Sequence, residues 1–433
     1  MRLLLRNYVG ISALFFCLLA AQAALSSPAL GKSGAPDPDF GRGGTFSSPA
    51  KIGGVVGVDY LSNNRLVSAL SRYGSEDVLY SAASIPGLGK DDLAFGRYGE
   101  AHSAFVGPSA AATDLAVAPD SSYFLTGWHG RPNLAMGYVI SHFTSDGNPI
   151  KRFGSGGTAV GKAVGKVGKD IALTAVDVQK DGKAVASGGH GIGFGTRPAG
   201  IVMRFRNNGR PDHSFSGDGI ARFPVSGRNG SSTALMDIEA LPNGKILASG
   251  YSKGRVIAVR LKKNGKRDRS FGGNGVVTLP RTASQSCEVN GWCLEGALTV
   301  AANGDPIILS NRPHSKSKGK ACECVDIIRL TKRGKRRKGF GNHGVATMGR
   351  TLQYGTEIIA RRNGQIIAAG AVGGHMGAVQ LKQNGKLDRS FGTNGRVSVG
   401  CPWRAESAHL APNGKLTLAG AGDKRLHFAR FLP

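Results

Sequence analysis

Short runs of apolar or alternating apolar and polar residues recur along the whole chain. Four successive runs, beginning at Gly219, read "GIARFPV", "TALMDIEAL", "KILASGY" and "RVIAVRL". Glycine, asparagine, aspartate and proline bound them, and no stretch carries the caps and period of an amphipathic helix. Runs of this length with such boundaries predict β-strands. The second and third runs are joined by "PNGK", the Asn-Gly signal of a two-residue hairpin.

A second pattern shows that these runs belong to a repeat of about 58 residues. A Phe-Gly or Phe-Ser step recurs seven times, at Phe40, Phe95, Phe153, Phe215, Phe271, Phe340 and Phe391. Glycine always stands four residues later, at Gly44, Gly99, Gly157, Gly219, Gly275, Gly344 and Gly395. Glycine also always stands six residues earlier, at Gly34, Gly89, Gly147, Gly209, Gly265, Gly334 and Gly385. Aspartate stands three residues before five of the Phe residues, and Ile150 and Arg337 replace it in copies three and six.

Seven copies with about four antiparallel strands each predict an all-β fold, a seven-bladed β-propeller. A parallel β-helix is the structural alternative, but its repeats are far shorter and need no hairpins. The final residues "RLHFARFLP" match a fourth run, and "GKSGAPDPDFG" near the start matches the segment that comes after such a run in the other copies. The two ends therefore complete one period, which predicts a closed ring without an exposed sheet edge.

The segments "GKRDRSFGGNGVVTL" and "GKLDRSFGTNGRVSV", with "PNGKILASG" and "VIAVRLKKNG", resemble the bacterial delta-60 repeat. The resemblance extends over residues 31–433. It implies an exported repeat protein of propeller type and implies little about activity. Copies three and six depart from the motif at the aspartate, so the resemblance does not make that residue obligatory.

The glycine-rich motif has two interpretations, a phosphate-binding loop or a structural joint. A phosphate loop leads into a helix N-terminus, whereas "FGGNG" leads into the strand run "VVTL". We therefore favour the joint, in which glycine adopts positive φ, aspartate caps the turn and Phe fills the gap between sheets. Calcium on the aspartates is not expected, because one carboxylate per copy supplies too few oxygens. No cofactor is expected.

The first 23 residues predict an export signal. Arg2 and Arg6 precede the apolar run "GISALFFCLLA", and "AQA" at 21–23 forms a small-residue cleavage site. Residues 24–433 then form a single propeller domain, with repeats starting near 40, 95, 153, 215, 271, 340 and 391. No later segment is apolar enough for a transmembrane helix. We expect a secreted or periplasmic protein, whose oligomeric state the sequence leaves open.

The chain is strongly basic, with a formal net charge of +28. Such a field attracts anionic polymers at low salt, although it can also simply keep an exported protein soluble. The basic segments "TKRGKRRKGF" and "SKSKGK" fall at expected surface turns and contain no interleaved stacking aromatics. Nucleic acid is therefore not the expected partner. The expected partner is therefore an anionic polymer of the cell envelope or the extracellular space, or another exported protein.

Copy five carries two insertions, "PRTASQSCEVNGWCLEG" and "NRPHSKSKGKACEC". They hold Cys287, Cys293, Cys322 and Cys324, which the topology places side by side at one end of the ring. We predict a disulfide, or two, between the first pair and the second. A zinc site is the alternative, although its ligand spacing is unusual. Cys401 is the candidate for an unpaired thiol.

Function is predicted as two main alternatives, and a structural surface protein that assembles with itself is a third. The first is a non-catalytic binding or scaffold propeller, whose variable loops contact the partner. The second is a metal-assisted lyase or hydrolase that uses His129, His190 and His375, which follow the third run of three copies. Solvated surface histidines would explain the same pattern, and no nucleophile–base motif stands near them.

Overall fold

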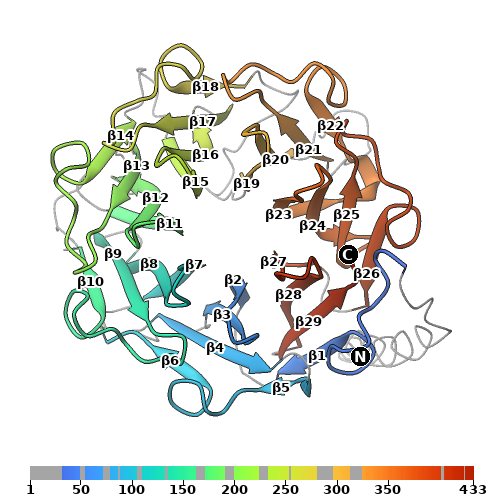
Figure 1. The fold of residues 1–433 in the computed structure, drawn as a ribbon, viewed down its shortest axis with the longest axis horizontal. Coiled ribbons are helices and arrows are strands. Elements are labelled where there is room, and N and C mark those ends of the chain that lie inside the picture. Colours follow the sequence, from blue (N-terminus) through green and yellow to red (C-terminus); the bar gives the residue numbers. More distant parts are fainter. Residues whose placement is uncertain are drawn as a thin grey trace, which may run out of the picture.

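The computed structural model describes residues 32–48, 54–71, 79–85, 88–104, 110–131, 135–161, 171–190, 199–223, 233–252, 255–279, 296–312, 324–400, 404–423 and 425–433. These residues form seven antiparallel sheets arranged around an axis (Figure 1), which confirms the predicted seven-bladed, all-β propeller. A short 3-10 helix, η2 (Gly349–Thr351), interrupts the strands. None of the helices in the described ranges has the length and apolarity to cross a lipid bilayer.

Each sheet is a blade, numbered 1 to 7 along the chain, and runs from an inner strand at the axis to an outer strand at the rim (Figure 1). The inner strands are β2 (Gly54–Tyr60), β7 (Ala111–Val117), β11 (Ile171–Val178), β15 (Thr233–Ala240), β19 (Leu298–Val300), β23 (Tyr354–Ala360) and β27 (Ser407–Leu410). The second strands are β3 (Leu66–Ser71), β8 (Tyr123–Arg131), β12 (Ala184–His190), β16 (Ile246–Ser252), β20 (Pro306–Arg312), β24 (Ile366–Val372) and β28 (Leu416–Gly422).

The two remaining positions complete each blade. The third strands are β4 (Tyr80–Ile85), β9 (Ala135–Phe143), β13 (Ala199–Arg204), β17 (Arg255–Leu261), β21 (Cys324–Arg329), β25 (His375–Leu381) and β29 (Arg425–Phe431). The outer strands are β5 (Lys90–Asp91) with β6 (Glu100–His102), then β10 (Thr158–Val160), β14 (Ile220–Phe223), β18 (Val276–Thr278), β22 (Val345–Thr347), β26 (Arg396–Val399) and β1 (Thr45–Ser48).

The sequence repeat and the blade are offset by one strand. The run that follows each Phe pairs with the run that comes before that Phe, and is the outer strand of the same blade. For example, β14 follows Phe215 and pairs with β13. For the same reason β1 is the outer strand of blade 7, where Thr45 lies opposite Ala429 on β29. The N–H of Gly34 donates to the carbonyl of Leu432 at 3.0 Å and extends this pairing. The ring is therefore closed by strands from both ends of the described chain, as the matching end sequences predicted.

The apolar core is divided among the contacts between blades. Seven clusters of buried side chains occur among the described residues, and each joins two adjacent blades. The cluster between blades 3 and 4, for example, contains Val185 and Val202 from one sheet and Leu235 and Val259 from the other. Burying apolar side chains between twisted sheets stabilises the ring one contact at a time. A single blade has no core of its own.

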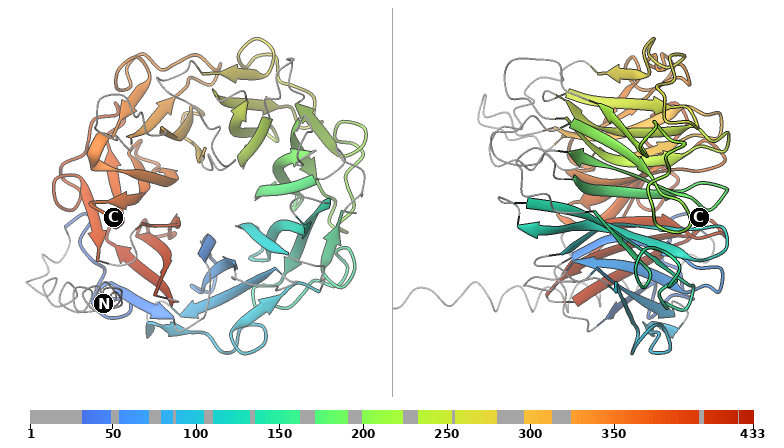
Figure 2. Two further views of the ribbon diagram at one scale, coloured as in Figure 1. Left: turned by 180° about the vertical axis from the view of Figure 1, so that it is seen from behind. Right: turned by 90° about the vertical axis from the view of Figure 1, so that its left-hand side faces the viewer.

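The antiparallel connections give the ring two different ends. Hairpins between inner and second strands lie at one end, together with the motif-bearing turns between third and outer strands. We call this end the turn face. Figure 2 shows the described turns projecting from the same side of the ring. At the opposite end the structure describes the connections at 348–353 and 373–374, next to blade 6, whereas the two insertions of copy five and most other connections lie outside the described residues.

Candidate functional site

The repeated motif forms a joint between neighbouring blades on the turn face. All seven motif Phe side chains are fully buried, and each belongs to a different interblade cluster. In blades 1 to 6, the N–H of the residue after the Phe donates to a carbonyl in the next blade's turn, at 2.7–3.0 Å. The motif therefore links one blade to the next through both an apolar contact and a backbone hydrogen bond.

Both motif glycines occupy backbone conformations that favour glycine. The seven at the earlier position have φ between +57° and +83°, and the seven at the later position have φ between +84° and +101°. The earlier glycine also lies against the neighbouring blade, because a Cβ on Gly209 would stand 2.6 Å from the backbone nitrogen of Gly154. Glycine is required there both by its dihedral angles and by the close approach of another chain segment.

The motif aspartate caps its own turn and binds the blade's basic side chains. Asp212 accepts hydrogen bonds from the N–H and hydroxyl of Ser214 through Oδ1 and from Nε of Arg204 through Oδ2. Burial by itself would raise the pKa of Asp212, but the bonds from Ser214 and the charges of Arg204 and Lys183 lower it to about 2. The Arg204 guanidinium also lies over the ring of Phe215, 4.9 Å from its centroid.

Blade 5, which carries the sixth copy of the motif, keeps this arrangement, but the charges of its motif turn and its hairpin are exchanged. Arg337 replaces the motif aspartate, and Asp305 replaces the hairpin lysine that Lys245 represents in blade 4. The Asp305 carboxylate is fully buried and accepts from Nε of Arg337 at 2.8 Å and from Nε of Arg329 at 3.2 Å. One carboxylate therefore still binds two cations, but it comes from the hairpin between the inner and second strands instead of the motif turn.

Blade 2, which carries the third copy of the motif, has an uncharged contact in place of the aspartate–arginine ion pair. Ile150 stands in the aspartate position, and His142 takes the strand position that Arg204 and Arg260 hold in blades 3 and 4. The His142 ring stacks on Phe124 with a centroid distance of 3.9 Å and shares a hydrogen bond with Ser122. Burial lowers the pKa of His142 to about 4, so the imidazole is neutral at physiological pH.

Exposed basic residues are unevenly distributed over the turn face. Twelve exposed lysines and arginines lie in the turns 262–275, 331–344 and 382–395 of blades 4, 5 and 6, which we call the basic arc. They are Lys262, Lys263, Lys266, Arg267, Arg269, Lys332, Arg333, Lys335, Lys338, Lys382, Lys386 and Arg389. The aspartates in these turns, Asp268 and Asp388, are buried and bound within the joint. The equivalent turns of the other four blades carry two exposed basic residues each.

Inner-strand side chains form a second ring of interblade bonds around the axis. Carboxylates at the inner strands accept backbone N–H groups from the next blade. The bonds are Val176 N to Asp114 Oδ2 at 2.8 Å, Ala240 N to Asp177 Oδ2 at 2.6 Å, Leu298 N to Asp237 Oδ2 at 2.5 Å, Val55 N to Glu406 Oε2 at 2.8 Å and Val117 N to Asp59 Oδ2 at 3.4 Å. Asp59 of blade 1 meets His409 of blade 7 at 3.0 Å. These contacts connect blades that the motif already joins on the turn face.

The surroundings of Asp177 and Glu239 favour the protonated forms of these two carboxyl groups. Burial raises the pKa of Asp177 to about 6. Burial also raises the pKa of Glu239 to about 8, and repulsion from Asp177 and Asp237 adds to this effect. At neutral pH the Glu239 carboxyl group is therefore mainly protonated. Among the described residues, no group of three or more His, Cys, Asp or Glu side chains has an arrangement that could hold a metal ion.

The sequence-predicted histidines do not form one site in the described structure. His129 on β8 is buried, and its Nε2 donates to the carbonyl of Gly161 at 3.0 Å. His375 on β25 is exposed, and its Nδ1 donates to the carbonyl of Gly400 at 2.9 Å. Figure 1 places β8 and β25 on opposite sides of the ring. The backbone of His190 ends β12, and its side chain lies outside the described residues.

The predicted disulfide partners cannot be placed. Cys287, Cys293, Cys322 and Cys401 lie outside the described residues, and for Cys324 the structure describes the backbone at the start of β21. The disulfide therefore stays a prediction.

Two features of the site were not expected from the sequence. The charge exchange at Asp305 required knowledge that the hairpin and the motif turn lie together. The inner carboxylates keep no fixed spacing from the motif Phe. Their spacing from the hairpin is more regular. Asp177 stands five residues before the hairpin glycine Gly182, and Asp237 stands seven residues before the hairpin glycine Gly244. This spacing was available in the sequence.

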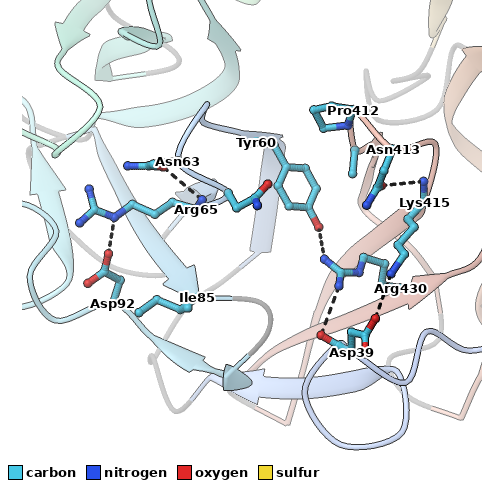
Figure 3. Close-up of a pocket in the computed structure, with 12 residues that line it drawn as sticks. Asp39, Tyr60, Asn63, Arg65, Ile85, Asp92, Pro412, Asn413, Lys415 and Arg430 are labelled. Carbon is cyan, nitrogen blue, oxygen red and sulfur yellow. Dashed lines mark hydrogen bonds and ion pairs between the residues drawn. The ribbon is translucent and has the colours of Figure 1, made fainter.

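A pocket of about 790 Å³ lies where blade 7 meets blade 1 (Figure 3). It opens on the turn face between two hairpins, which contribute Asn413 and Lys415 from blade 7 and Asn63 and Arg65 from blade 1. Asp39 of the first motif also lines it. We call it the seam pocket.

Comparison with known proteins supports the fold. Residues 241–271 match a family model described as a domain of unknown function (DUF5122) beta-propeller. This segment contains the blade 4 hairpin, β16, β17 and the motif Phe271. No curated protein matches the chain in sequence.

Solved structures resemble the chain over most of its length. The polysaccharide lyase Uly1 superposes with a TM-score of 0.51 at 12% identity, over 95% of both chains. The Dos1 propeller gives 0.48 at 9% identity, over 92% of this chain and 96% of that one. An alpha-L-arabinanase from Penicillium chrysogenum gives 0.44 at 10% identity, with the same two coverages of 92% and 96%. At these identities the similarity concerns the fold alone, and the seven antiparallel blades of the chain itself identify that fold as a β-propeller.

Proposed function

We propose that this protein is an exported, non-catalytic scaffold propeller that binds an anionic polymer through the basic arc. The observation that supports this function is the concentration of twelve exposed cations in three consecutive turns, where the aspartates of the same turns are buried and paired. A surface of one sign without local compensation produces a field that attracts polyanions. An evenly basic surface would have supported solubility as the explanation instead.

The arc provides charge without exposed apolar or aromatic groups. The large hydrophobic side chains that are exposed in the described structure are Leu88, Leu93, Tyr98 and Val160, all in blades 1 and 2. Base stacking and membrane insertion both require such groups at the contact surface. We therefore propose an acidic glycan or similar envelope polymer as the partner. The variable loops were the expected contact, whereas the charge distribution favours the turn face at the opposite end of the ring.

We also propose that the chain is a delta-60 repeat protein. The seven motif copies and the short propeller match at residues 241–271 support this assignment.

The test compares two variants that each lose four cations. The arc variant carries Ser at Lys263, Lys266, Lys335 and Lys386, and the control carries Ser at Lys32, Lys151, Arg152 and Arg210, which lie on turns of other blades. Fluorescent alginate, heparin and duplex DNA are titrated at several salt concentrations. With about 1 kcal/mol per cation near an anionic surface, the arc variant should lose at least about tenfold in affinity. The control should change by less than about threefold.

Affinity for the polyanions should also fall as salt rises, with a weaker dependence in the arc variant because fewer counterions are released. Equal losses in the two variants would show that net charge, and not the arc, determines binding. Tighter binding to DNA than to the glycans would contradict the assigned partner.

A further inference from the structure

The seam pocket arises at a joint whose third-strand arginine departs from the pattern of blades 3, 4 and 5. In blades 3 and 5, the third-strand arginine sends Nη1 to a carbonyl in the next blade's turn, as Arg204 does to Lys263 at 2.5 Å and Arg329 does to Gln383 at 3.0 Å. In blade 7, Nη1 of Arg430 instead contacts the hydroxyl of Tyr60, at 3.4 Å. Tyr60 ends the inner strand β2 of blade 1, so this arginine bonds to a side chain of the next blade and not to a carbonyl of its turn.

The cations of the seam pocket are neutralised by neighbouring carboxylates. Lys415 lies 2.9 Å from Asp37 and 3.5 Å from Asp39, and Arg430 lies 2.5 Å from Asp37. On the blade 1 side, Arg65 is paired with both Asp92 and Asp146. Three cations therefore face four carboxylates, and the pocket presents no surplus of positive charge. An anionic ligand has no electrostatic reason to bind there, unlike at the basic arc.

Polar groups of the pocket retain hydrogen-bonding capacity of both kinds. The Oδ1 atoms of Asn63 and Asn413 accept the N–H groups of Arg65 and Lys415, each at 3.2 Å, which leaves both amide NH₂ groups as donors. Asp39 supplies an acceptor, since its side chain is 80% exposed. Donors and acceptors side by side match hydroxyl groups, each of which can both donate and accept.

The pocket also contains an apolar surface. Ile85, Ala411 and Pro412 contribute to its lining alongside the polar groups (Figure 3). A sugar ring presents C–H groups on its faces and hydroxyl groups around its edge, so it can use both parts of this lining. The volume of about 790 Å³ lies within the usual range of about 300–1,000 Å³ for small-ligand sites.

We propose that the seam pocket binds a neutral sugar unit, with Asn63, Asn413 and Asp39 bonding its hydroxyl groups and Pro412 and Ile85 contacting its C–H face. This site is separate from the basic arc and goes beyond the polymer-binding function. Its ligand is recognised by hydroxyl geometry, whereas the partner of the arc is recognised by charge.

Saturation-transfer NMR on the full protein tests the site with glucose, galactose, mannose and N-acetylglucosamine as probes. Galacturonate, which matches galactose except for a carboxylate, tests the charge argument. The pocket variants are Asp39→Ala and Asn413→Ala. Asn243→Ala is the matched control, because Asn243 makes the same turn bond to Lys245, at 3.1 Å, in a hairpin away from the pocket.

At least one neutral sugar should bind saturably to the unaltered protein. Loss of one hydrogen bond, at about 0.5–1.5 kcal/mol, should weaken that sugar about twofold to tenfold in both pocket variants. The control and the arc variant should bind it as the unaltered protein does. If Asn413→Ala fails to fold, Asp39→Ala decides the question, because its side chain is exposed.

Three results would overturn the proposal. They are no saturable neutral sugar, an equal loss in Asn243→Ala, or tighter binding of galacturonate than of galactose. Loss of sugar binding would leave polymer binding by the arc intact, so the two proposals fail separately.

Discussion

Gly209 illustrates why so short a motif can determine so large an assembly. Its φ of +80° is reached easily by glycine, and its α-carbon lies against the turn of the preceding blade. Gly217, in the same turn, has a comparable φ of +91°, but a Cβ there would meet no atom within 4 Å. One glycine is therefore needed for conformation and contact, and the other for conformation alone.

This difference gives a direct prediction. Gly217→Ala should cost about 1–2 kcal/mol in the free energy of unfolding, the usual penalty for an L-residue in the left-handed region. Gly209→Ala should cost about 1–3 kcal/mol more, because the added carbon forces two blades apart. Urea unfolding of both variants measures the difference. Equal losses would show that the close approach to Gly154 contributes nothing.

Different side-chain interactions stabilise the same position of the interblade joint in different blades. Blade 3 uses a carboxylate from the motif, blade 5 uses a carboxylate from the hairpin, and blade 2 uses a neutral stacked histidine. In all three, buried charge is either compensated or avoided, since an unpaired buried charge costs several kcal/mol. The aspartate is therefore replaceable when its partner changes with it.

Exchanging the charges of blade 5 tests this interpretation. Arg337→Asp would place two carboxylates beside Arg329, and Asp305→Lys would leave three cations without an anion. Each should destabilise the protein by about 2–4 kcal/mol. The double variant restores the arrangement of blade 4 and should recover most of that loss. The double-mutant cycle, measured by urea unfolding, should show a strong favourable coupling, and additive losses would contradict the exchange.

The assembled ring separates its charges by depth. Carboxylates gather at the axis and inside the joints, while exposed cations gather on the turn face of blades 4 to 6. Glu239 at the axis has a pKa raised to about 8, above that of an unfolded glutamate. A carboxyl group of this kind stabilises the fold fully below its unfolded pKa, near 4.5, and that stability is lost as pH rises through about 8. Asp212 acts oppositely, because its stabilisation is lost as pH falls below 3.8 toward about 2.

Stability should therefore decline as pH rises from 5 to 9. Glu239→Gln removes the titrating group and keeps a hydrogen-bonding side chain, so its unfolding midpoint in urea should fall less over this interval. Measurements at pH 5, 7 and 9 for both proteins provide the check. A parallel decline in the two proteins would exclude Glu239 as a source of the pH dependence.

Propeller class, blade number and ring closure could be predicted from the sequence, because they depend on local signals repeated seven times. Strand runs, Asn-Gly hairpins and motif glycines each describe a few neighbouring residues, and their period counts the blades. The one-strand offset between repeat and blade left this count unchanged.

The chemistry of the site depended on which segments meet in space. Asp305 compensates Arg337 from 32 positions away in sequence, and the seam pocket joins Asp39 to hairpins at residues 63–65 and 413–415. The basic arc likewise consists of turns that are separated along the chain and adjacent around the ring. Local sequence patterns carry no information about such contacts, since the folding of each blade, the packing of neighbouring blades and the closure of the ring bring the residues together. The repetition therefore predicts the scaffold, and only the tertiary structure reveals where that repetition is broken.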